Sequence, residues 1–150
     1  MKLKSIDEIL DFAIEKEEDA AQFYTELAGK MKSDHIKNVF LGFAEEEKGH
    51  KRKLESVKSG KRMISAEKKV LDLKIGDHLV DIALDSNLDY QEALIVAMKA
   101  EKAAYKLYME LAGSTDDAEV QNLFIALANE EAKHKLRFEI EYDDAILTEN

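Results

Sequence analysis

The chain of 150 residues contains no cysteine and no proline, and it has only six glycines. Without cysteine it can form neither a disulfide, nor a thiolate zinc site, nor a thiol nucleophile. Proline and glycine are the residues that most disfavour helix interiors, so their scarcity leaves long helices uninterrupted. Hydrophobic residues make up 45% of the chain and charged residues 36%, a mixture that suits amphipathic helices. We therefore expect a single all-α domain.

The sequence also lacks a long apolar run and an excess of basic residues. No segment approaches the roughly 18 apolar residues of a membrane span, and the first ten residues, MKLKSIDEIL, do not resemble a signal peptide. The 22 basic residues are outnumbered by 32 acidic ones, and the short basic runs lie beside glutamates. We therefore expect a cytoplasmic protein that binds neither membranes nor nucleic acid.

An internal repeat organises the chain. A shift of 84 positions brings residues 5–57 over residues 89–141 without a gap. EEDAAQFYTELAG, which begins at Glu17, aligns with EKAAYKLYMELAG, which begins at Glu101. NVFLGFAEEEKGHK aligns in the same register with NLFIALANEEAKHK. Such a match over two helices and their turn indicates two related helical hairpins rather than chance similarity.

The boundaries of four helices follow from this repeat. Helices are predicted over about 5–29, 33–59, 89–113 and 115–145. Expected caps are Ser5 and Asp89 with a glutamate three residues later, Ser33 or Asp34, and Thr115 or Asp116; Gly29 and Gly113 are expected to end helices in a left-handed conformation. A crossover over about 60–87 is long enough for the second and third helices to run parallel. The prediction is a ferritin-like four-helix bundle of two hairpins joined by a long crossover.

Helical periodicity places two single glutamates on the inward face. Glu17 lies in the apolar series of the first helix, whereas Glu15 and Glu18 are rotated away from it. Its repeat counterpart is Glu101, while the counterparts of Glu15 and Glu18 are both lysines. A position that alternates between glutamate and lysine behaves as solvated surface. We therefore expect Glu17 and Glu101 to be buried.

The second and fourth helices each carry a Glu-x-x-His sequence on the same kind of stripe. Glu47 with His50 recurs as Glu131 with His134, and the i, i+3 spacing puts each pair on one helix face. Glu45 is replaced by an asparagine in the second copy, which indicates surface. The roles of Glu46 and its counterpart Glu130 stay open, because both copies have glutamate about 100° away from the stripe.

Four carboxylates and two imidazoles buried together need a compensating charge. No lysine or arginine lies on the inward stripes near them, and two divalent ions would balance four carboxylates. We predict a di-metal site held by six residues, namely Glu17, Glu47, His50, Glu101, Glu131 and His134. A glutamate of the first or third helix is expected to bridge the ions, with each Glu-x-x-His supplying terminal ligands. Two iron ions fit this ligand set, and manganese or zinc also fit it.

These motifs resemble the rubrerythrin branch of the ferritin-like superfamily over essentially the whole chain. The resemblance is carried by Glu17 and Glu101, each followed seven residues later by a tyrosine, and by the sequences EEKGH and EEAKH. It implies a non-haem di-iron site held by the six residues named above. It also places Tyr24 and Tyr108 beside the site, where they orient bridging carboxylates or simply pack in the aromatic core.

Two departures from the rubrerythrin pattern bear on function. Rubrerythrin has a further glutamate three residues after the one on its third helix, where this chain has Ala104, mirrored by Ala20. Rubrerythrin is also fused to a rubredoxin domain with cysteine-bound iron, which this cysteine-free chain lacks. The first departure puts the peroxidase mechanism in doubt. The second means that electrons would have to come from a separate donor, such as a rubredoxin-like protein.

The expected function is that of an oxidoreductase in which a di-iron site reduces peroxide or dioxygen. One alternative is iron handling, as a ferroxidase or storage protein. Others are a manganese- or zinc-loaded bundle without redox turnover and a metal-free structural bundle. A homodimer is expected, and whether the protomers exchange helices through the crossover is left open.

Overall fold

Four long helices account for nearly all of the chain that the computed structural model describes, residues 5–61 and 89–149. They are α1 (Ile6–Lys30), α2 (Asp34–Lys61), α3 (Tyr90–Gly113) and α4 (Ala118–Glu149). The predicted all-α fold is confirmed, and the predicted helices agree with these limits to within four residues. The crossover expected over about 60–87 lies outside the described residues, apart from its first two residues, which are the last two of α2. No helix in the two described ranges is both long and apolar enough to cross a bilayer.

Side-chain caps explain where three of the helices begin. Ser5 Oγ accepts the backbone N–H of Glu8 at 3.2 Å, and Asp89 Oδ1 accepts that of Glu92 at 2.7 Å. Ser33 Oγ lies 3.5 Å from the N–H of Ile36 at the start of α2. Each bond satisfies one of the N–H groups that a helix leaves unpaired in its first turn. The predicted caps at these three positions are confirmed.

The predictions for three helix ends are wrong in detail. No residue of the described ranges has a positive φ, so Gly29 and Gly113 do not form left-handed caps. Gly29 lies inside α1, and the chain leaves that helix through the extended residue Met31. The helix α4 is capped by Asp117, whose Oδ1 accepts the N–H of Val120 at 3.0 Å, and not by Thr115 or Asp116. Ser114, which caps the end of α3, is in the αR conformation, and α4 begins at Ala118, three residues later than predicted.

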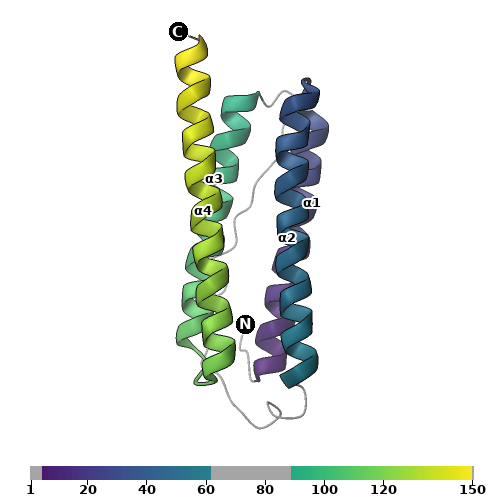
Figure 1. The fold of residues 1–150 in the computed structure, drawn as a ribbon, viewed down its shortest axis with the longest axis vertical. Helices are drawn as coiled ribbons and strands as arrows, with labels where there is room; N and C mark the ends of the chain where they lie inside the picture. Colours follow the sequence, from purple (N-terminus) through teal and green to yellow (C-terminus); the bar gives the residue numbers. More distant parts are fainter. Residues whose placement is uncertain (1–4, 62–88, 150) are drawn as a thin grey trace.

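The four helices form two antiparallel hairpins that lie side by side (Figure 1). The helix α1 packs along α2, and α3 packs along α4; the two hairpins also meet where α2 approaches α4. In Figure 1 the chain runs down α2 and down α3, so these two helices are parallel, as the long crossover predicted. The arrangement is a four-helix bundle with one long connection between its hairpins.

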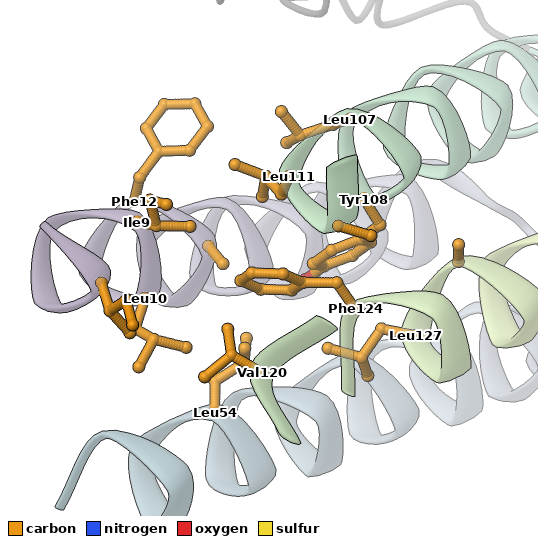
Figure 2. Close-up of a cluster of buried hydrophobic side chains, with 14 residues drawn as sticks. Ile9, Leu10, Phe12, Leu54, Leu107, Tyr108, Leu111, Val120, Phe124 and Leu127 are labelled. Carbon is orange, nitrogen blue, oxygen red and sulfur yellow. The ribbon is translucent and has the colours of Figure 1, made fainter. Parts of the chain in front are cut away.

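Two apolar clusters fill the bundle toward its two ends. One joins the first half of α1 and the end of α2 to the second half of α3 and the first half of α4; Figure 2 shows its side chains, among them Leu10, Leu54, Tyr108 and Phe124. The other includes Tyr24, Phe40, Ala97 and Phe138, at the opposite ends of the same helices. Between the clusters each helix contributes polar residues to the interior. The apolar residues on either side therefore enclose a polar centre.

Candidate metal centre

The six predicted residues meet in the middle of the bundle. Glu17 comes from α1, Glu101 from α3, and a Glu-x-x-His pair from each of α2 and α4. All six are at most 5% exposed, whereas most of the other glutamates and aspartates whose burial is described lie at the surface. The structure therefore brings together every residue that the sequence placed in the site.

The six side chains form two overlapping groups of potential ligands. One group contains Glu17, Glu47, His50 and Glu131, and the other contains Glu47, Glu101, Glu131 and His134. Within each group, one nitrogen or oxygen atom per residue lies within 4.8 Å of the corresponding atoms of the others. Mixed carboxylate and imidazole ligands at such distances suit iron, manganese or zinc. The geometry provides two adjacent positions for a cation.

The residues shared by the two groups lie on α2 and α4, whereas the predicted bridging residues lie on α1 and α3. Glu47 and Glu131 belong to both groups, whereas Glu17 and Glu101 each belong to one. The reason lies in the packing: α2 and α4 approach each other across the bundle, so their glutamates meet at its centre. His50 Nδ1 lies 3.1 Å from Glu131 Oε1, and His134 Nδ1 lies 3.0 Å from Glu47 Oε1, each pair spanning the two hairpins.

Seven buried side-chain atoms of the described residues make no hydrogen bond of acceptable geometry, although some lie within ion-pair distance of each other, and all seven belong to this cluster. They are Oε2 of Glu17 and Glu101, both carboxylate oxygens of Glu47, Oε1 of Glu131, and Nδ1 of His50 and His134. Such buried groups are normally paired, because burying one without a partner costs about 1–3 kcal/mol. The unpaired atoms are carboxylate oxygens and imidazole nitrogens, which are metal-ligating atoms. The donor set therefore fits a pair of metal ions.

Burial and mutual repulsion raise the affinity of Glu47 and Glu131 for protons. Burial, with the nearby charge of Glu17, raises the pKa of Glu47 well above its ordinary value. Burial, with the charge of Glu101, does the same for the pKa of Glu131. Burial alone would lower the pKa of His134, but the adjacent carboxylates of Glu101 and Glu47 outweigh it and raise that pKa to about 10. Protons thus replace part of the missing positive charge in the metal-free protein.

Two buried tyrosines each hold one carboxylate oxygen of Glu17 or Glu101 in place. The Tyr24 hydroxyl donates to Glu101 Oε1, and the Tyr108 hydroxyl donates to Glu17 Oε1, so each bond joins the two hairpins. Burial, together with the charge of the accepting carboxylate, raises the pKa of each tyrosine well above its ordinary value. Both hydroxyls therefore keep their protons and act as donors. They contact Glu17 and Glu101 and not the shared Glu47 and Glu131.

Glu46, whose role the sequence left open, lies directly outside the site. Its Oε2 is 3.2 Å from Nε2 of His134, the ring nitrogen that faces away from the other carboxylates. Arg137 lies 3.0 Å from the same oxygen and stacks over the ring of Phe43. Neither Arg137 nor Phe43 was predicted from the sequence to contact the site. Comparison of the two copies of the repeat does not single them out, because the residue equivalent to Arg137 is Lys53 and the residue equivalent to Phe43 is Leu127.

A helical bundle with this buried carboxylate–histidine centre has the architecture of ferritin-like proteins. The sequence profile of the Rubrerythrin family matches residues 8–142. The chain belongs to the rubrerythrin family, as its motifs predicted. No curated protein matches the chain significantly.

Two solved structures are similar to this fold. A hypothetical protein from Pyrococcus furiosus is 28% identical, with a TM-score of 0.64 over 91% of this chain and 87% of its own. A protein from Thermotoga maritima, provisionally described as a ferritin-like diiron-carboxylate protein, is 20% identical, with a TM-score of 0.76 over 97% of this chain and 99% of its own. The second likeness supports the ferritin-like fold.

Proposed function

We propose that the chain is a di-iron oxidoreductase that reduces peroxide or dioxygen with electrons from a separate donor protein. The observation that carries this proposal is the set of seven buried, unpaired ligand atoms, all on six residues at the centre of the bundle. Membership of the rubrerythrin family and the two overlapping ligand groups support it further. Iron is the metal we propose, because two ferrous ions can supply the two electrons that the reduction needs, whereas zinc has no redox chemistry.

The six residues would hold the two ions in equivalent sets. Glu17 with His50 would hold one ion, Glu101 with His134 the other, and the shared glutamates would contact both. Ala104 stands where the resembling proteins have a further glutamate, so the ligand set stays at one glutamate and one Glu-x-x-His pair from each hairpin. Four carboxylates then neutralise two divalent ions.

Bound ferrous ions would supply one electron each to the oxidant. Reduction of hydrogen peroxide to two water molecules takes two electrons and two protons, and the electrons are then restored by the donor. The protein itself would bind the two ions and hold their ligands in a fixed orientation. Tyr24 and Tyr108 keep the single glutamates in place through hydroxyls that retain their protons. The apolar clusters at both ends exclude bulk water from the centre.

The proposal is tested by loading the metal-free protein anaerobically with two Fe(II) per chain and mixing it with hydrogen peroxide. We expect oxidation of two Fe(II) for each peroxide consumed, at a rate well above that of Fe(II) in buffer. Glu47→Ala should abolish this acceleration, because Glu47 belongs to both ligand groups. Glu45→Ala is the matched control, since Glu45 is an exposed neighbour paired with Lys48. Oxidation no faster than in buffer would refute the proposal.

The same preparation separates this function from iron storage. An oxidoreductase saturates at two iron ions per chain and turns over when a chemical reductant replaces the donor. A storage protein continues to take up iron far beyond that ratio and does so as a large assembly. We propose a homodimer, and size-exclusion chromatography with light scattering measures the mass directly.

A further inference from the structure

The two halves of the centre have the same ligands but different surroundings. The shift of 84 positions relates His50 to His134 and Glu46 to Glu130. In the His134 half, Glu46 lies 3.2 Å from Nε2 of the imidazole. In the His50 half, Glu130 pairs with Lys133 at 3.4 Å instead. Among the described residues, the carboxylates within ion-pair distance of His50 all approach its Nδ1.

The contacts around Glu46 form a connected support for the His134 ring. Arg137 places one guanidinium nitrogen 3.2 and 3.0 Å from the two oxygens of Glu46. The same guanidinium lies over the Phe43 ring at 4.3 Å, and that ring meets the His134 imidazole edge-on at 5.0 Å. The imidazole is thereby held both by a carboxylate at its outer nitrogen and by an aromatic ring at its side.

The repeat shows that this support is confined to one half. The positions equivalent to Phe43 and Arg137 are Leu127 and the exposed Lys53. Leucine cannot provide the aromatic contact, and lysine lacks the planar guanidinium that stacks on a ring. No corresponding arrangement holds His50 in the described part of the chain. The six ligands are nearly symmetric, whereas the residues directly outside them are not.

A carboxylate beside the outer nitrogen of an imidazole favours the tautomer with its proton on that nitrogen. For His134 this leaves Nδ1, which faces Glu47, Glu101 and Glu131, free to bind a cation. Such a carboxylate also fixes the ring orientation and makes the ligating nitrogen more basic. Removing partners of this kind typically lowers metal affinity by about 10–100-fold.

We propose that Glu46, braced by Arg137, is a positioning residue that makes the two metal positions unequal, so that a divalent cation binds more tightly at the Glu101–His134 position than at the Glu17–His50 position. This inference rests on the proposed di-metal site and adds an order of filling to it. The first ion would occupy the supported half, and the second ion would be the more readily exchanged.

The test is a titration of the metal-free full-length chain with Mn(II), with free Mn(II) measured by its EPR signal. The wild-type protein should bind two ions in two steps, the first at least about tenfold tighter. Glu46→Gln, which keeps the shape but removes the charge, should weaken the first step by about tenfold and leave the second unchanged. Glu130→Gln is the matched control and should change neither step. His50→Gln should retain the tight step, and His134→Gln only the weak one.

A second readout reports on the imidazole itself. In Zn(II)-loaded protein with ¹⁵N-labelled histidine, the Nε2 proton of His134 should exchange with water more slowly than that of His50. Glu46→Gln should remove this difference, whereas Glu130→Gln should not. Two binding steps of equal affinity, or equal effects of the two glutamine variants, would overturn the inference while leaving the di-metal site intact. Failure of the wild-type protein to bind Mn(II) or Zn(II) would instead refute the site and, with it, the inference.

Discussion

The Tyr24 hydroxyl on α1 donates a hydrogen bond to Glu101 on α3, 77 residues further along the chain. Tyr108 and Glu17 form the reciprocal pair between the same two helices. Each hairpin thus supplies the tyrosine that fixes the single glutamate of the other. Since both partners are buried, neither hairpin satisfies its own polar centre, and the interface between the hairpins is specified by polar as well as apolar contacts.

Replacing Tyr24 by phenylalanine should therefore destabilise the metal-loaded protein by about 2 kcal/mol, because Glu101 Oε1 loses its donor in a buried position. Urea unfolding followed by circular dichroism measures the change in the free energy of unfolding. Tyr108→Phe should cost a similar amount, as the two bonds are equivalent. Tyr105→Phe is the control on the surface of α3 and should have no measurable effect. If all three variants were as stable as the wild-type protein, the two buried hydrogen bonds would contribute nothing to stability.

The apolar cluster that contains Tyr108 should be sensitive to the loss of a single ring. Phe124 is fully buried, and its ring stacks on that of Tyr108 at 5.9 Å (Figure 2). Phe124→Ala should lower the free energy of unfolding by about 3–5 kcal/mol through the cavity it creates. Ile125→Ala, at a neighbouring position that is 37% exposed, should stay within about 0.5 kcal/mol of wild type. Similar losses in the two variants would contradict the burial described for this helix.

The sequence predicted the helices and the membership of the buried cluster because the repeat tests each position twice. Glu17 could be separated from Glu15 and Glu18 by periodicity and by comparison with the second copy. Periodicity gives the direction in which a side chain points, and for residues on long helices that direction is enough to identify the interior. The assignment of these residues as metal ligands stays a prediction.

The sequence could not predict distances between helices, and two details of the site depend on them. The close approach of α2 to α4 puts Glu47 and Glu131 at the shared position, which no pattern within one helix reveals. The contact of Glu46 with His134 likewise joins α2 to α4 across the bundle. Helix ends show a similar limit, because three consecutive residues, Thr115, Asp116 and Asp117, could each cap α4, and only the structure identifies Asp117 as the cap.

Metal removal should destabilise the protein, since two bound cations would provide the positive charge that the buried carboxylates need. Differential scanning calorimetry with and without Zn(II), which avoids redox chemistry, measures the shift in Tm. At free metal about a thousandfold above Kd, binding to the folded state alone adds about 4 kcal/mol.

The variant Glu47→Gln/Glu131→Gln provides the control for this measurement. It removes two of the four negative charges and both shared ligands, so its Tm should be nearly independent of Zn(II). A wild-type Tm that does not respond to metal would contradict the site.

The metal-free protein should lose stability as the pH rises. Glu47 and Glu131 have raised pKa values in the folded state, so above about pH 4.5 the folded chain holds protons that the unfolded chain has released. The charge of His134 acts in the same direction: its contribution is complete below about pH 6.5 and is lost as the pH approaches its folded-state pKa of about 10. Where the folded state binds more protons, the free energy of unfolding decreases with pH.

Urea unfolding of chelator-treated protein between about pH 5 and 9 should therefore show a steadily falling midpoint. Glu47→Gln/Glu131→Gln should flatten much of this dependence, because glutamine mimics the protonated carboxylate at every pH. The difference in midpoint between Zn(II)-loaded and metal-free protein should grow with pH. The reason is that the ligands must lose their protons before they can bind the ion. A metal-free midpoint that rises over this range would mean that the buried carboxylates carry no excess protons, and the electrostatic account of the centre would then be wrong.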